Sequence, residues 1–343
     1  MTGQDSVQQT PSTPVPPGAG PPRHRPGEHS LFGPMADVAG ESGYDEHPAR
    51  VGFFTDTSVC IGCKACEVAC KEWNLVPDDG FDLLGMSYDN TGTLGANSWR
   101  HVAFIEQPVR AERRTTASEG TPTPRSGSPA ASPVDLGMPS FELPGAGTGA
   151  ETRQEFRWLM ASDVCKHCTH AGCLDVCPTG ALFRTEFGTV VVQQDICNGC
   201  GYCVSGCPYG VIERREGDGR AWKCTLCYDR LHGGLEPACA KACPTESIQF
   251  GELDELRGRA QRRVEQLHEQ GVAEARLYGE SPEDGVGGQG SIFLLLDEPE
   301  VYGLPPDPVV PTRDLPRMWK FAAAAGAAMV GAIVMVFQEG RRR

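Results

Sequence analysis

The stretch CNGCGYCVSGCP (197–208) contains four cysteines within eleven residues, at the spacing C-x2-C-x2-C-x3-C, and a proline follows the last of them. The stretch CIGCKACEVAC (60–70) repeats this spacing, but Lys71 stands where the proline would be. Two further motifs have longer gaps: CKHCTHAGCLDVCP (165–178), and the pairs CTLC (224–227) and CAKACP (239–244), which eleven residues separate. The four motifs together contain all sixteen cysteines of the 343-residue chain.

This spacing is typical of proteins that bind [4Fe–4S] clusters. The first three cysteines of a C-x2-C-x2-C run wrap around one cluster, and the fourth, three residues later, ligates the other cluster of a pair. The longer gaps of the second and fourth motifs still leave three local ligands with a small loop between them. The proline after the last cysteine fixes the direction in which the chain leaves the site. The sequence therefore predicts four [4Fe–4S] clusters.

Zinc sites and disulfide bonds are the competing explanations for so many cysteines. Structural zinc sites use cysteine pairs that are typically a dozen or more residues apart, and four cysteines within eleven residues do not fit that pattern. A C-x2-C-x2-C run also has poor geometry for disulfide bonds. His167 and His170 lie within the second motif and could ligate iron, as histidine does in Rieske centres. Because four cysteines are already present there, we expect both histidines to face solvent or to lie beside the ligands.

Five lysines stand close to the cysteines in the sequence. A positive charge near a cluster favours its reduced form and raises its reduction potential, but a solvated lysine would have no such effect. The sequence does not distinguish the two possibilities for Lys64, Lys71, Lys166, Lys223 and Lys241.

The whole chain is predicted to be an α+β protein with two ferredoxin-like two-cluster modules, short strands and helices, long loops and one C-terminal transmembrane helix. Residues 1–50, rich in Pro, Gly and Ser, are expected to be a disordered tail. Residues 51–252 form the predicted four-cluster domain, with a low-complexity insertion at 110–151. Residues 253–316 are expected to supply a cover helix, with apolar residues at helical spacing over 252–277, then a strand at 291–296 and a linker.

The C-terminal residues 317–340 are predicted to span a membrane. The uncharged run FAAAAGAAMVGAIVMVF (321–337) has seventeen residues, near the lower limit for crossing a bilayer. Trp319 and Lys320 flank one end, and arginines 341–343 flank the other, as interface anchors do. A buried alanine-rich helix of a soluble protein is the alternative.

The composition and motifs of the chain also argue against several other functions. The formal net charge is −14 and no long basic run is present, which argues against nucleic acid because binding phosphates needs a basic surface. The first thirty residues have no apolar segment of the kind found in a cleavable secretory signal. No Ser/His/Asp set and no Walker or dinucleotide fingerprint is present, so we expect no catalytic site on this chain.

At these motifs the sequence resembles the iron–sulfur (beta) subunit of membrane-bound respiratory formate dehydrogenases. This subunit belongs to a four-cluster family that also serves dimethyl sulfoxide, nitrate and polysulfide reductases. The resemblance is carried by CIGCKACEVACKEWN (60–74), CNGCGYCVSGCPYGV (197–211) and the stretch 222–251. The stretch 277–308 and the C-terminal helix resemble the formate dehydrogenase member in particular. The match covers 51–109 and 152–340.

The resemblance implies how the cysteines are shared, which their spacing alone does not show. The first and fourth motifs would share two clusters, and the second and third would share the other two. The implied ligand sets are Cys60, Cys63, Cys66 and Cys243 for cluster 1; Cys70, Cys224, Cys227 and Cys239 for cluster 2; Cys165, Cys168, Cys173 and Cys207 for cluster 3; and Cys177, Cys197, Cys200 and Cys203 for cluster 4.

The resemblance also implies a function. The protein would carry electrons from a molybdopterin subunit (Mo or W) that oxidises formate to a membrane cytochrome b and quinone. One alternative is the same role in a dimethyl sulfoxide, polysulfide or nitrate reductase, or in a hydrogenase. A free ferredoxin-like carrier or a structural metal module is an alternative of a different class.

The expected location is the cytoplasmic membrane, which the chain would cross once. Arginines 341–343 favour a cytoplasmic C-terminus, but Arg313, Arg317 and Lys320 on the other flank make the charge count nearly even. The resemblance implies that the cluster domain lies on the extracytoplasmic side. It would be exported folded, as a passenger of the catalytic subunit.

Overall fold

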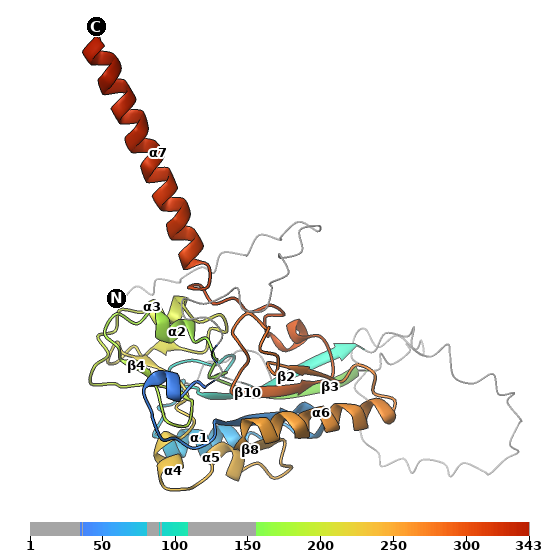
Figure 1. The fold of residues 1–343 in the computed structure, drawn as a ribbon. Helices are drawn as coiled ribbons and strands as arrows, with labels where there is room; N and C mark the ends of the chain where they lie inside the picture. The colour runs from blue at the N-terminus through green and yellow to red at the C-terminus, as the bar shows by residue number, and fades with distance from the viewer. Residues whose placement is uncertain (1–34, 36, 81–88, 90, 109–155, 343) are drawn as a thin grey trace, which may run out of the picture.

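The computed structural model describes residues 35, 37–80, 89, 91–108 and 156–342 (Figure 1). Most of the predicted tail and the whole predicted insertion at 110–151 lie outside the described residues. Residues 37–50, which the sequence assigns to the tail, are ordered: they include the 3-10 helix Gly40–Ser42, and Val38 is buried. The hydroxyl of Tyr44 donates a hydrogen bond to the backbone oxygen of Arg184. The predicted boundary at residue 50 is therefore wrong, because a few side chains anchor this polar stretch.

A four-stranded sheet in the order β8-β1-β10-β9 forms the centre of the molecule. Strand β1 (Val51–Asp56) pairs antiparallel with β8 (Ile248–Glu252) and parallel with β10 (Ser291–Leu295), and β10 pairs antiparallel with β9 (Arg276–Tyr278). Two strands of the predicted 253–316 segment thus share a sheet with residues 51–56. The predicted boundary at 252 does not separate two structural units.

Helix α6 (Leu253–Glu269) covers one face of this sheet. Leu256 and Ala260 of α6 pack in one apolar cluster with Phe54, Ile292 and Leu294 from the two central strands. The helix is shorter than the 252–277 pattern predicts: Gly271 adopts a left-handed φ of 87° just beyond its end, and Leu277 lies in β9. The predicted cover helix is thus present over its first two thirds.

The opposite face of the sheet is covered by a hairpin and by the cysteines themselves. Strands β2 (Arg100–Pro108) and β3 (Phe156–Val164) pair antiparallel along their whole length. Phe53 and Phe293, which alternate with the residues facing α6, belong to a second apolar cluster that includes Val102 and Leu159. This cluster also contains Cys66, Cys70, Cys165, Cys224 and Cys239. Short 3-10 helices at Thr57–Val59 and Pro299–Tyr302 complete this part of the fold.

Residues 165–222 form a smaller unit of short elements. It contains helices α2 (Gly172–Asp175) and α3 (Tyr202–Ser205) and two hairpins, β4–β5 (Leu182–Arg184 and Val190–Val192) and β6–β7 (Glu213–Arg214 and Ala221–Trp222). A third apolar cluster, which includes Leu182, Val190 and Ile212, also contains Cys203. Here too the cysteines belong to the core.

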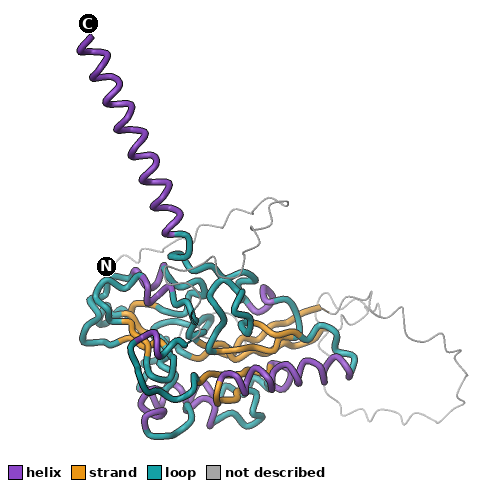
Figure 2. Tube along the Cα trace, viewed as in Figure 1, coloured by secondary structure: helices purple, strands orange, loops and turns teal. Residues whose placement is uncertain are grey.

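Helix α7 (Leu315–Arg342) projects alone from the body of the protein, as Figure 1 shows, and Figure 2 traces it as one uninterrupted helix. It is long and apolar enough to cross a membrane, and none of its apolar window is buried against the described protein. The side chains of Trp319, Phe321 and Met329 are exposed. The alternative of a buried alanine-rich helix is therefore wrong within this chain.

Candidate iron–sulfur sites

All four cysteine motifs begin with the same tight turn. The residue just before the second cysteine has a left-handed backbone in each motif: φ is 64° at Gly62, 44° at His167, 72° at Gly199 and 56° at Leu226. Glycine adopts this conformation without strain, whereas His and Leu do so at a cost. The turn directs two successive cysteines toward the same side. Backbone N–H groups then reach sulfur: the N–H of Leu226 lies 3.3 Å from the Sγ of Cys224.

The first and fourth motifs come together across two helices. Helix α1 (Ala65–Asn74) carries Cys66 and Cys70, and it lies beside α5 (Ala238–Lys241), which carries Cys239. Helix α4 (Tyr228–His232) begins just after Cys227. A small cavity at the start of α1 is lined by Cys60, Cys63, Cys66 and Cys243. The structure therefore brings together three cysteines of the first motif and the last cysteine of the fourth.

The next group joins Cys70 to the other three cysteines of the fourth motif. All four are buried. Burial raises the pKa of Cys70 well above its ordinary value, and the nearby thiolates of Cys224, Cys239 and Cys227 raise it further. Thiols in such a group hold protons at neutral pH unless cationic iron takes them as thiolates. The side-chain amide of Asn74 lies 3.8 Å from the Sγ of Cys70 and 3.6 Å from that of Cys227.

The second and third motifs come together in the smaller unit, where α2 lies beside α3. One cavity is lined by Cys165, Cys168, Cys173 and Cys207. The remaining cysteines form a group around Cys203, whose pKa is raised to about 11 by burial and then by the charges of Cys177, Cys197 and Cys200. The described residues thus gather the sixteen cysteines into four groups of four.

The four groups follow one another in a row. Beyond the effect of burial, Cys239 of the second group is close enough to Cys66 of the first for its charge to raise the pKa of that thiol. Cys165 of the third group has the same effect on Cys224 of the second. Burial is the main cause that raises the pKa of Cys173 in the third group, and the charge of Cys203 in the fourth group is a smaller cause in the same direction. Cys63 and Cys200, in the two end groups, are the exposed cysteines.

The residues around the third group fit a cluster. The Nδ1 of His167 accepts a hydrogen bond from the N–H of Val190 at 3.1 Å. Burial, with Lys223 and three arginines nearby, lowers the pKa of this imidazole well below its ordinary value, so the ring is neutral and its proton is on Nε2. This buried Nε2 has no partner within the described protein, and His167 lines the cavity. A cluster sulfur would supply the missing acceptor.

A single zinc ion fits less well. Tetrahedral zinc needs four ligand atoms converging at about 2.3 Å from the metal. Within the described ranges, no three His, Cys, Asp or Glu side chains converge closely enough to hold one metal ion. His167 and His170 are both buried, so of the two expected placements the solvent-facing one is excluded, and His167 lies beside the ligands, where it lines the cavity of the third group.

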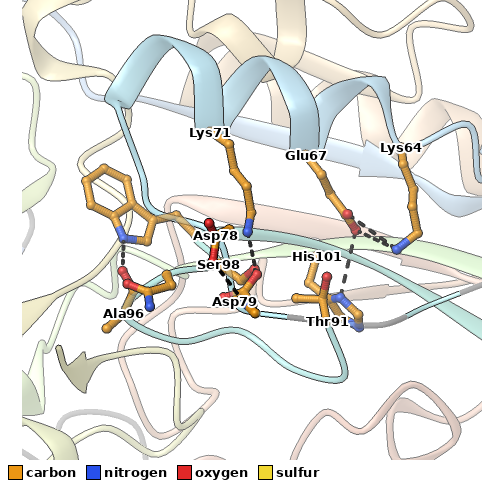
Figure 3. A network of polar contacts seen from close by, with 12 residues as sticks. Lys64, Glu67, Lys71, Asp78, Asp79, Thr91, Ala96, Ser98 and His101 are labelled. Atoms are coloured by element: carbon orange, nitrogen blue, oxygen red, sulfur yellow. Dashed lines mark hydrogen bonds and ion pairs between the residues drawn. The ribbon is translucent and has the colours of Figure 1, made fainter. Parts of the chain in front are cut away.

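Most lysines near the cysteines are neutralised by carboxylates. Figure 3 shows Lys64, just before α1, and Lys71, on α1, facing acidic side chains: Lys64 lies 3.1 Å from Asp89 and 3.3 Å from Glu67, and Lys71 is paired with Asp79. Lys166 is paired with Asp163 and Lys241 with Glu236. Lys223 differs, because its Nζ donates to the Sγ of Cys165 at 3.6 Å and to the backbone oxygens of Cys224 and Val190.

Sequence reasoning missed several residues that contact the cysteines, among them Asn74, Arg100 and Ser162. The Nη2 of Arg100 donates to the Sγ of Cys239 at 3.2 Å, and the Oγ of Ser162 lies 3.3 Å from the Sγ of Cys66. Arg100 lies thirty positions after Cys70, outside every motif. Only the pairing of β2 with β3 brings the side chains of Arg100 and Ser162 to the cysteines.

Comparison with known proteins identifies the family. Two models, each described as a 4Fe-4S dicluster domain, match residues 59–181 and 156–253. The nitrate-inducible formate dehydrogenase iron-sulfur subunit of Escherichia coli is 37% identical over 289 residues, which is 82% of each protein. The formate dehydrogenase iron-sulfur subunit of Haemophilus influenzae is 36% identical, covering 83% of this chain and 78% of its own length.

This chain belongs to that family of iron–sulfur subunits. A more distant relative is the B subunit of the anaerobic dimethyl sulfoxide reductase of Escherichia coli, 32% identical over 61% of this chain and 76% of its own length. As a member of the family, the protein is an electron-transfer protein. Its two dicluster domains and sixteen cysteines correspond to four [4Fe–4S] clusters.

Proposed function

We propose that this protein is the electron-transfer subunit of a formate dehydrogenase complex. It would connect a molybdopterin subunit (Mo or W) that oxidises formate to a membrane cytochrome b and quinone. The support is the extent of similarity: the formate dehydrogenase relative matches over 289 residues, and the dimethyl sulfoxide reductase subunit over 209. The longer match exceeds the two dicluster domains, which end at residue 253, so it includes segments outside the cluster sites.

The proposed ligand sets follow the four groups of cysteines. Cluster 1 is held by Cys60, Cys63, Cys66 and Cys243; cluster 2 by Cys70, Cys224, Cys227 and Cys239; cluster 3 by Cys165, Cys168, Cys173 and Cys207; and cluster 4 by Cys177, Cys197, Cys200 and Cys203. Each bound cluster would carry one electron at a time. The first two sites form one ferredoxin-like module and the last two form the other. The protein thus holds the four clusters in a fixed order and excludes water from the two inner sites.

The module that contains clusters 3 and 4 is the one nearer the membrane in this proposal. The linker that leads into α7 packs on α2: the Oγ1 of Thr312 donates to a carboxylate oxygen of Asp175 at 2.6 Å. In Figure 1, α2 and α3 lie on the side of the molecule from which α7 rises, and α1 and α5 lie on the far side. Cluster 1, beside exposed Cys63, would then face the catalytic subunit, and cluster 4, beside exposed Cys200, the cytochrome.

Formate added to membranes that contain the complete complex should reduce the clusters. We expect paramagnetic resonance signals of reduced [4Fe–4S] clusters to appear after anaerobic addition of formate, and to be absent when the protein is produced without its catalytic partner. The matched test of the alternative adds dimethyl sulfoxide to dithionite-reduced membranes. Reoxidation by dimethyl sulfoxide with no reduction by formate would assign the protein to a reductase instead.

The cluster domain is proposed to lie outside the cytoplasmic membrane, with the C-terminus inside. Arginines 341–343 follow the span directly and favour the cytoplasmic side, but the basic residues on the other flank make the charge count nearly even, so the proposal rests on the resemblance to respiratory formate dehydrogenases, whose cluster domain lies outside. Protease added to intact spheroplasts should therefore digest the cluster domain and leave a C-terminal tag intact. The control uses lysed spheroplasts, in which both should be cut. Protection of the cluster domain together with loss of the tag in intact spheroplasts would show the opposite orientation.

A further inference from the structure

Two fully buried cations of this protein donate hydrogen bonds to cysteine sulfur. They are Arg100, which is 1% exposed, and Lys223, which is 2% exposed. Neither forms an ion pair with a carboxylate anywhere in the described part of the chain. An isolated buried charge is costly unless a counter-charge lies nearby. The thiolates of the cluster sites are therefore the counter-charges of both cations.

Arg100 lies between the first and second cluster sites. Its Nη2 donates to the Sγ of Cys239 at 3.2 Å, and its Nη1 donates to the Oγ of Ser162 at 3.3 Å. The same Ser162 oxygen is 3.3 Å from the Sγ of Cys66. The guanidinium also stands 4.8 Å from the ring centroid of Phe53, which holds it in place. One positive charge thus faces a ligand of each site.

Lys223 lies between the second and third cluster sites, where the two modules meet. Its Nζ donates to the Sγ of Cys165 at 3.6 Å, on the third site. It also donates to the backbone oxygen of Cys224, a ligand of the second site, at 2.9 Å. The backbone oxygen of Val190 accepts the third N–H. All three donors of the ammonium group are therefore used, and its position is fixed.

We propose that Arg100 and Lys223 are redox-tuning cations, each shared by two successive clusters and each raising the reduction potentials of both. The proposal rests on the proposed ligand sets. Reduction adds one negative charge to a cluster that is already anionic, and a nearby positive charge stabilises that extra charge. The effect is large in a dry interior and small where water screens the charge. Arg100 acts on clusters 1 and 2, and Lys223 acts on clusters 2 and 3.

Because each cation acts on two clusters, the proposal predicts a pattern of shifted potentials. The pattern can be recognised without knowing which resonance signal belongs to which cluster. Arg100→Gln and Lys223→Gln each remove one charge and keep a hydrogen-bond donor. In redox titrations followed by paramagnetic resonance, each variant should shift two of the four midpoint potentials to more negative values. We expect about a tenfold loss in each reduction equilibrium, equivalent to about 59 mV for one electron. One cluster should shift in both variants, and one should shift in neither.

The matched control is Lys241→Gln. Lys241 stands between two ligands in the sequence, as Lys223 stands next to one, but its side chain is 71% exposed and paired with Glu236. No midpoint potential should shift in this variant. Arg100→Lys, which retains the charge, should retain the wild-type potentials, and it serves as the rescue if Arg100→Gln loses iron.

Three results would overturn the proposal. The first is a full set of four clusters with unchanged potentials in both Gln variants. The second is a shift of equal size in Lys241→Gln, which would point to net charge instead of burial. The third is a pair of variants that affect no cluster in common.

If both Arg100 variants fail to assemble, Lys223→Gln decides: it must shift two potentials. Loss of the four-cluster spectrum in the wild type would instead contradict the ligand sets.

Discussion

Replacing Cys243 with Ser is expected to destroy or alter the cluster that Cys60, Cys63 and Cys66 hold, although more than 170 residues separate Cys243 from them. These four cysteines line one cavity, and Cys243 follows the end of α5 beside the first three cysteines of the first motif. Serine is a poorer ligand for iron than a thiolate. We expect one of four paramagnetic resonance signals to be lost or changed, with a fall of about four iron atoms per protein if the cluster is lost.

Cys239→Ser is the matched control for this prediction. Cys239 lies one helical turn earlier in the same motif, yet it belongs to the group of Cys70, Cys224 and Cys227. The two variants should therefore affect different clusters, and Cys66→Ser should affect the same cluster as Cys243→Ser. If Cys239→Ser and Cys243→Ser change the same signal, the ligands of the fourth motif are not divided between two clusters.

The cysteine motifs could be predicted from sequence because the local backbone determines their geometry. Gly62 and Gly199 stand at the left-handed position just before the second cysteine, where glycine is favoured. The same position in the other two motifs holds His167 and Leu226, and composition gives no sign there that the turn is identical. Helix α7 could be predicted too, since an uncharged run of sufficient length needs no tertiary contact to be recognised.

Contacts between distant segments could not be predicted. The parallel pairing of β1 with β10 joins residues more than 230 positions apart, and it incorporates the predicted 253–316 segment into the central sheet. The roles of the charged residues depend on the same kind of contact. Lys71 and Lys223 each adjoin a ligand in sequence, but only the fold pairs Lys71 with Asp79 and leaves Lys223 facing sulfur. Arg100 carries no motif signal at all.

The ordered stretch at 37–50 shows a similar limit. It has few large apolar residues, and its 3-10 helix spans only Gly40–Ser42. What anchors it is a small number of specific contacts, such as the Tyr44 hydroxyl with the Arg184 backbone and the buried side chain of Val38. Low apolar content predicts disorder on average, but it does not exclude a stretch that packs on a surface built by other segments.

Anaerobic analysis of iron, acid-labile sulfide and zinc in the purified protein tests the central claim most directly. Four clusters of four irons and four sulfides predict about sixteen iron and about sixteen sulfide per protein, with zinc near zero. The measurement requires protein kept reduced and free of oxygen, because damaged clusters lose iron. A preparation rich in zinc and free of acid-labile sulfide would contradict the assignment of the sixteen cysteines to iron–sulfur clusters.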